Sequence, residues 1–189
     1  MKLVLKHFIC NDATDDPGGD SPYFVIFVGH PKTLPTGDPA DLAHLDYHVV
    51  TVWKAAWDDA IQDGTPRSPN LVVKSNSDHK TLHIDGNTAI IVALCEQDDN
   101  VDITADERLQ IKQDLINPWI DFGGIIGTSD GYAIARKMRT KFRQAIDDAM
   151  SNDDILGVAS MHPTFGPHHL NFVSKDDAYD YAVTFSLED

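Results

Sequence analysis

Acidic side chains gather in two parts of this chain, each beside an apolar run that is typical of a β-strand. The first group, between the runs 2–10 and 22–28, comprises Asp12, Asp15, Asp16 and Asp20. The second group is split along the sequence and comprises Glu96, Asp98, Asp99, Asp153 and Asp154. Carboxylates at one end of a β-sandwich repel each other unless a hard cation joins them, and clusters of oxygen ligands suit calcium. Asp is also common in loops because it favours turns, so for either group alone an ordinary loop is the simpler interpretation.

Length and composition favour a single soluble domain over residues 1–189. Acidic residues outnumber basic ones by 30 to 15, which argues against a nucleic-acid partner. Cys10 and Cys95 lie within apolar runs and are interpreted as buried thiols, which favours a reducing compartment. No apolar run approaches the roughly 20 residues that span a bilayer, and residues 1–10 do not form a signal peptide. We therefore expect a cytoplasmic protein with no transmembrane segment, while secretion without a recognisable signal stays open.

The hydrophobic pattern predicts a mainly β fold, an antiparallel β-sandwich of about eight strands with a two-helix insertion. Short apolar or alternating runs predict strands at 3–9, 23–28, 47–52, 71–74, 81–84, 88–94, 155–161, 170–173 and 179–187. Residues 85–87 (Asp-Gly-Asn) are typical of a hairpin turn, and residues 53–61 have helical spacing. The insertion covers about 103–150. Its first helix opens with a capping box, Thr104 with Glu107, and should stop near Pro118; its second runs from about 130 to 150 over an apolar stripe.

Three short segments resemble a known family. Residues 15–25 (Asp-Asp-Pro-Gly-Gly-Asp-Ser-Pro-Tyr-Phe-Val) are similar to the first calcium loop of the C-two domain of the synaptotagmin and protein kinase C type. Residues 94–98 and 152–157 resemble the two halves of that family's third loop, and the insertion lies between them. The first segment departs from the family pattern because Ser and Asp are exchanged, and the third loop would begin with Glu instead of Asp.

The resemblance implies a calcium site at one tip of the sandwich. Carried over position by position, the ligands would be Asp15, Asp20, Glu96, Asp98 and Asp154. Asp16, Asp99 and Asp153 are neighbours that could replace one of them. A sandwich of this family that has lost calcium and kept its acidic loops is the alternative.

The insertion carries a local reversal of charge, because one predicted helix holds five of the fifteen basic residues. The expected contact residues for an anionic membrane surface or a protein partner are Trp119, Phe122, Ile125, Ile126, Arg136, Lys137, Arg139 and Arg143. A solvated helix face, paired with the abundant carboxylates, is the plainer interpretation.

Other site chemistries find little support. The first acidic group does not fit an EF-hand, since Pro17 stands where that loop needs Gly. His44 and His48 lack the surrounding pattern of a zinc hydrolase, and there is no Gly-x-Ser-x-Gly elbow. The sequence thus favours a non-enzymatic calcium-binding module that docks to anionic lipid or a protein. The alternatives are a metal-free interaction domain of the same fold and, with less support, a metal-dependent hydrolase.

Overall fold

The computed structural model describes residues 1–12, 21–32, 45–52, 64, 66–97, 103–124, 130–150, 153–174 and 179–189. Within these residues the strands are β1 (Lys2–Asp12), β2 (Pro22–Gly29), β3 (Tyr47–Val52), β4 (Pro66–Arg67), β5 (Leu71–Val72), β6 (Ala89–Glu96), β7 (Asp154–Met161), β8 (Gly166–Ser174) and β9 (Tyr179–Glu188). The helices are α1 (Ala105–Asp114), α2 (Ile116–Asp121) and α3 (Gly131–Ala149). The prediction of a mainly β fold with antiparallel sheets is confirmed.

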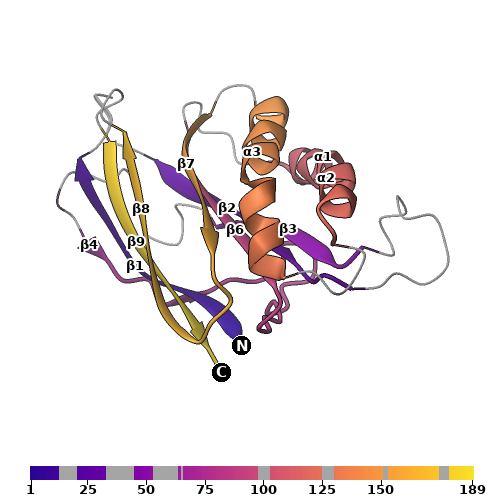
Figure 1. Cartoon of the computed structure of the whole chain (residues 1–189). Helices are drawn as coiled ribbons and strands as arrows, with labels where there is room; N and C mark the ends of the chain where they lie inside the picture. The colour runs from indigo at the N-terminus through magenta and orange to yellow at the C-terminus, as the bar shows by residue number, and fades with distance from the viewer. Residues whose placement is uncertain are drawn as a thin grey trace.

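The strands form two antiparallel sheets, and the helices add a third layer (Figure 1). The outer sheet has the order β4-β1-β9-β8, with β5 also paired to β1. The central sheet has the order β3-β2-β6-β7. One hydrophobic core lies between the two sheets, and a second lies between the central sheet and the helices.

The central sheet is buried on both faces, which explains the composition of its two inner strands. Every residue of β2 and of β6 is buried. Phe24 and Ile26 of β2 belong to the core between the sheets, whereas Val25 and Phe27 belong to the core under the helices. Continuous apolar runs, instead of alternation, are what burial on both faces requires.

The helical segment lies between β6 and β7, which are hydrogen-bonded neighbours. The capping box is present: Glu107 N–H donates to Thr104 Oγ1 at 3.2 Å, and Thr104 N–H donates to the Glu107 carboxylate at 2.7 Å. We expected the first helix to stop near Pro118, and that was wrong. Leu115 separates α1 from α2, and Pro118 occupies the first turn of α2, where its missing N–H is not needed.

Two other local predictions fail in the same region of the sheet. Residues 81–84 form no strand, and only a single bridge joins Thr81 to Lys74. Ile84 N–H donates to Met1 O at 2.9 Å, and the amino terminus donates to Ile84 O at 2.8 Å. The turn at 85–88 therefore carries the chain from the outer to the central sheet, and it does not close a hairpin. The predicted helix at 53–61 lies outside the described residues.

Candidate functional site

The described acidic residues meet at one end of the central sheet. In the strand register, Glu96 at the end of β6 lies opposite Pro22 at the start of β2 and opposite Asp154 at the start of β7. The chain segments that carry the predicted calcium ligands therefore enter and leave the sheet side by side. The ligand predictions Asp15, Asp16, Asp20, Asp98 and Asp99 themselves lie outside the described residues.

Glu96 and Asp154 occupy directly paired positions, so their side chains project from the same face of the sheet. Their neighbours Leu94 and Leu156 belong to the core between the sheets, which identifies this as the face toward the outer sheet. Glu96 is only 4% exposed, whereas Asp154 is exposed. Two carboxylates at paired positions repel, and a cation or a proton between them relieves that repulsion.

Asp153 lies on the opposite face of the central sheet, the face that the helices cover. Its carboxylate accepts a hydrogen bond from Tyr23 Oη at 2.7 Å, and the same hydroxyl lies 3.5 Å from Met150 Sδ. Burial raises the pKa of Tyr23, with further contributions from Cys95 and Asp153, and burial also raises the pKa of the Cys95 thiol. Tyr23 and Cys95 therefore stay protonated, and one Asp153 oxygen is already occupied.

No group of three or more His, Cys, Asp or Glu side chains suited to a metal occurs within the described residues. Of the predicted ligands in the described part of the chain, Glu96 and Asp154 are paired on one face of this sheet end, and Asp153 lies on the other face. Glu96 and Asp154 supply hard oxygen donors that fit calcium, while Asp153 fits only in part because Tyr23 already donates to it.

The predicted contact residues of the insertion divide into buried and exposed sets. Trp119 is 1% exposed and packs against Phe27 and Tyr47, with ring centroids 5.4 and 5.7 Å apart. Phe122 is half-buried against the same core. The expectation that Trp119 serves as a membrane or partner contact is therefore corrected, because this ring anchors the helical layer. Ile125 and Ile126 lie outside the described residues.

The basic residues of α3, in contrast, are exposed. They are Arg136, Lys137, Arg139, Lys141 and Arg143. None of the five forms an ion pair with a described carboxylate. The apolar stripe that we predicted on this helix does pack inward, with Met138, Phe142 and Ile146 fully buried. Among the described residues, no helix is long and apolar enough to cross a membrane.

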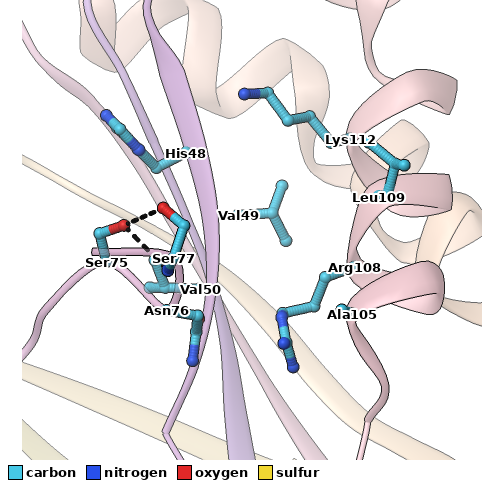
Figure 2. Close-up of a pocket in the computed structure, with 10 residues that line it drawn as sticks. All are labelled: His48, Val49, Val50, Ser75, Asn76, Ser77, Ala105, Arg108, Leu109 and Lys112. Carbon is cyan, nitrogen blue, oxygen red and sulfur yellow. Dashed lines mark hydrogen bonds between the residues drawn. The ribbon is translucent and has the colours of Figure 1, made fainter. Parts of the chain in front are cut away.

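Sequence reasoning missed a pocket between the edge strand β3, the turn 75–77 and α1 (Figure 2). Its volume is about 280 Å³, and Val49 lies between its two walls. The turn contributes Ser75, Asn76 and Ser77, and α1 contributes Ala105, Arg108, Leu109 and Lys112. In α1, Arg108 and Lys112 stand four residues apart on one helix face, which is a signal in the sequence. The pairing of that face with His48 depends on the tertiary fold.

A second pocket, of about 480 Å³, adjoins the first through His48 and Ser75. Its cations already have partners, since Lys32 pairs with Asp46 at 3.1 Å and Lys80 with Asp78 at 3.0 Å. Hydrogen bonds from Lys80 hold the pKa of Asp78 at about 2. The charges of Lys32 and Lys80 in this second pocket are therefore neutralised by its own carboxylates.

Fold and site together define a sandwich-like, mainly β protein with a helical layer on one sheet and an acidic sheet end. No family model, curated protein or solved structure matches the chain, so the likeness to the C-two domain rests on the three short segments alone.

Proposed function

We propose that this protein is a non-enzymatic, C-two-like calcium-binding module whose ion lies at the end of the central sheet. The observation that carries the proposal is the paired placement of Glu96 and Asp154 on one face, at the end where the acidic segments leave the strands. The further ligands would come from Asp15, Asp20 and Asp98. Calcium accepts six to eight oxygen ligands, which several carboxylates together with main-chain carbonyls and water can supply.

Binding would change the electrostatics of this end of the molecule. The chain carries a net charge of −15, and carboxylates gathered at one end repel an anionic partner. A bound divalent cation reverses the local potential, so that an anionic surface can approach. The proposed function is therefore calcium-controlled docking, with the carboxylates holding the ion and other surfaces making the contact.

We expect calcium to stabilise the folded protein and Asp154→Asn to remove most of the gain. A ligand that binds only the folded state stabilises it by about 2.7 kcal/mol at a hundredfold excess over its dissociation constant. Without calcium, Asp154→Asn should be neutral or slightly stabilising, because it relieves repulsion with Glu96. The measurement is calorimetric titration with calcium, joined to thermal unfolding with and without the ion.

Asp121→Asn is the matched control, since Asp121 is exposed at the end of α2, away from the sheet end. It should bind calcium like the parent protein. A thermal midpoint that does not respond to millimolar calcium would instead support the metal-free interaction domain.

A second function is favoured by the five exposed basic residues of α3, which form no ion pair with a described carboxylate. In this interpretation α3 docks to an anionic membrane surface or an acidic protein partner, with or without calcium. The helix is fixed to the central sheet by its buried stripe, so its cations are presented on a rigid support.

We expect Arg136→Gln with Arg139→Gln to weaken binding to phosphatidylserine-containing vesicles. Each basic residue near an anionic surface contributes about 1 kcal/mol, so removing two costs roughly 2 kcal/mol, or about thirtyfold in affinity. Binding should also fall steeply as salt rises. Vesicle co-sedimentation at several salt concentrations measures both effects. Lys2→Gln with Lys74→Gln removes the same charge elsewhere, and an equal loss in that control would show that only net charge matters.

A further inference from the structure

The pocket beside β3 combines basic side chains, hydroxyl groups and the edge of the central sheet. Burial lowers the pKa of its Lys112, and the charge of Asp46 acts against that shift. Lys112 is half-buried, and no carboxylate in the described part of the chain forms an ion pair with it. Its ammonium lies 5.4 Å from the centre of the Tyr47 ring. Tyr47 Oη donates to Lys112 O at 2.6 Å, which fixes this end of α1 against β3. The cation is thus held in place beside the pocket.

Two further basic groups line the same pocket. His48 is half-buried, and its pKa is lowered by burial first and then by the charge of Lys112. Arg108 donates one guanidinium N–H to Ile103 O at 2.7 Å, so its fork is already partly used. The charge of Asp46 acts on both Lys112 and His48, but Asp46 forms its ion pairs with His30 and Lys32, so the cation of Lys112 still favours an anionic ligand.

The strand edge supplies main-chain donors. His30 N–H donates to Asp46 O, and this bond sets the ladder so that Tyr47, Val49 and Thr51 direct their N–H and C=O groups away from β2. Thr51 N–H is taken by Asn76 Oδ1 at 2.8 Å. The N–H of Val49 therefore points toward the open edge along which the pocket lies. An added peptide strand needs a longer run of such groups, and Asn76 blocks it.

The turn on the opposite wall brings hydroxyl groups that already have partners. Ser75 Oγ and Ser77 Oγ share a hydrogen bond at 2.9 Å, and Ser75 also donates to the Asp78 carboxylate. Apolar side chains of Val49, Val50, Ala105 and Leu109 complete the lining. The volume of about 280 Å³ is at the small end for ligand sites, so the occupant is a small molecule.

We propose that this pocket binds the phosphate group of a small phosphorylated molecule. A tetrahedral phosphate accepts hydrogen bonds from several directions, which suits donors that come from β3 and α1. A carboxylate is planar and is best bound by two N–H groups of one free guanidinium. In this pocket the Arg108 guanidinium already donates to Ile103 O, and the other charged donor is Lys112. The apolar remainder of the ligand would lie against Val49 and Leu109.

The test is an NMR titration with inorganic phosphate, phenyl phosphate, benzoate and an acidic peptide, at constant ionic strength. We expect saturable shifts of the Val49 amide and the His48 ring with both phosphates, and tighter binding of phenyl phosphate. Lys112→Gln should weaken binding about tenfold or more, as expected for a charged hydrogen bond, while Lys112→Arg retains most of it. Lys141→Gln removes an exposed lysine of α3 and should leave binding unchanged.

The affinity of the parent protein relative to a His48→Gln variant should rise as the pH falls through the pKa of His48, since the imidazolium attracts the phosphate, while protonation of the ligand, with a pKa of about 6, affects both proteins alike. The other charged groups that act on His48 are Asp46, His30 and Asp78, besides Lys112, and the profile should persist when Asp78 is replaced by Asn. Unsaturable shifts, or equal weakening by Lys112→Gln and Lys141→Gln, would overturn the proposal. Benzoate binding as tight as phenyl phosphate, or a response to the peptide alone, would overturn it as well. Thermal unfolding of each variant without ligand excludes loss of fold as the cause.

Discussion

Replacing Trp119 with alanine should destabilise the protein by about 3–5 kcal/mol, the usual cost of removing a large buried aromatic ring. Trp119 is 1% exposed and contacts the rings of Phe27 and Tyr47, which belong to β2 and β3. The indole thus joins α2 to two strands of the central sheet. In a protein of this size the loss corresponds to a fall of roughly 6–20 °C in the thermal midpoint.

The chain around Trp119 is shaped to fit this ring, so the site has little capacity to collapse. A Cβ on Gly124 would lie 2.0 Å from Trp119 Cε2, and one on Gly29 would lie 2.7 Å from Cη2. Both glycines are therefore needed for close approach of the backbone to the indole. Trp119→Phe should cost clearly less than Trp119→Ala because it retains part of the packing.

Phe165→Ala is the control, since that ring is 67% exposed and should change stability by less than about 0.5 kcal/mol. Urea unfolding gives the change in the free energy of unfolding for the three variants. It should be followed by far-UV circular dichroism, because that signal reports secondary structure and does not rely on Trp119. A loss below about 1 kcal/mol for Trp119→Ala would contradict its place in the core, and would return this residue to the exposed contact surface.

Local sequence patterns predicted where the strands and helices lie better than they predicted which segments pair with each other. The strands at 23–28, 47–52 and 179–187, the capping box at Thr104 and the stripe of α3 all follow from spacing within one segment. The apolar run 81–84 has the same local pattern, yet Ile84 pairs with Met1 across the fold. Its partner lies 83 residues away in sequence, and no local signal identifies it.

The helical layer on the central sheet was not predicted, because it also depends on contacts between segments that are distant in the sequence. The runs 23–28 and 89–95 lack alternation, and this is the sign of a strand buried on both faces. A two-layer sandwich, the predicted architecture, buries only one face of each strand and gives the stripe on α3 no sheet face to cover. Taken together, the two signals predict the helix-covered central sheet.

The candidate sites differ in the same way. The acidic groups are conspicuous in the sequence, and the strand register pairs Glu96 with Asp154. The phosphate pocket combines His48, Ser75 and Lys112, which come from a strand, a turn and a helix. Each of these residues is ordinary by itself. They line one pocket only because α1 packs beside the edge strand β3 in the folded protein.

Gly131→Ala should destabilise the protein by about 3 kcal/mol, although alanine is the better helix former. Gly131 is the first residue of α3, and its N–H donates to Asn87 Oδ1 at 3.1 Å. A Cβ at this position would lie 2.0 Å from the main-chain oxygen of Asn87 and 2.7 Å from Ala89 N. Since backbone atoms cannot rotate away, the start of α3 has to move off the start of β6.

The sign of this change decides between two effects. Helix propensity favours alanine over glycine by about 1 kcal/mol, and less than that at a helix end. Overpacking against backbone typically costs about 1–3 kcal/mol and here also disturbs the hydrogen bond that Gly131 N–H donates to Asn87 Oδ1. Gly86→Ala is a matched control, because a Cβ there meets no atom within 4 Å. Thermal unfolding should show a fall of roughly 6–12 °C for Gly131→Ala and little change for Gly86→Ala. If Gly131→Ala stabilised the protein instead, the close contact between α3 and the turn before β6 would be disproved, and with it the docking of the helical layer at this end.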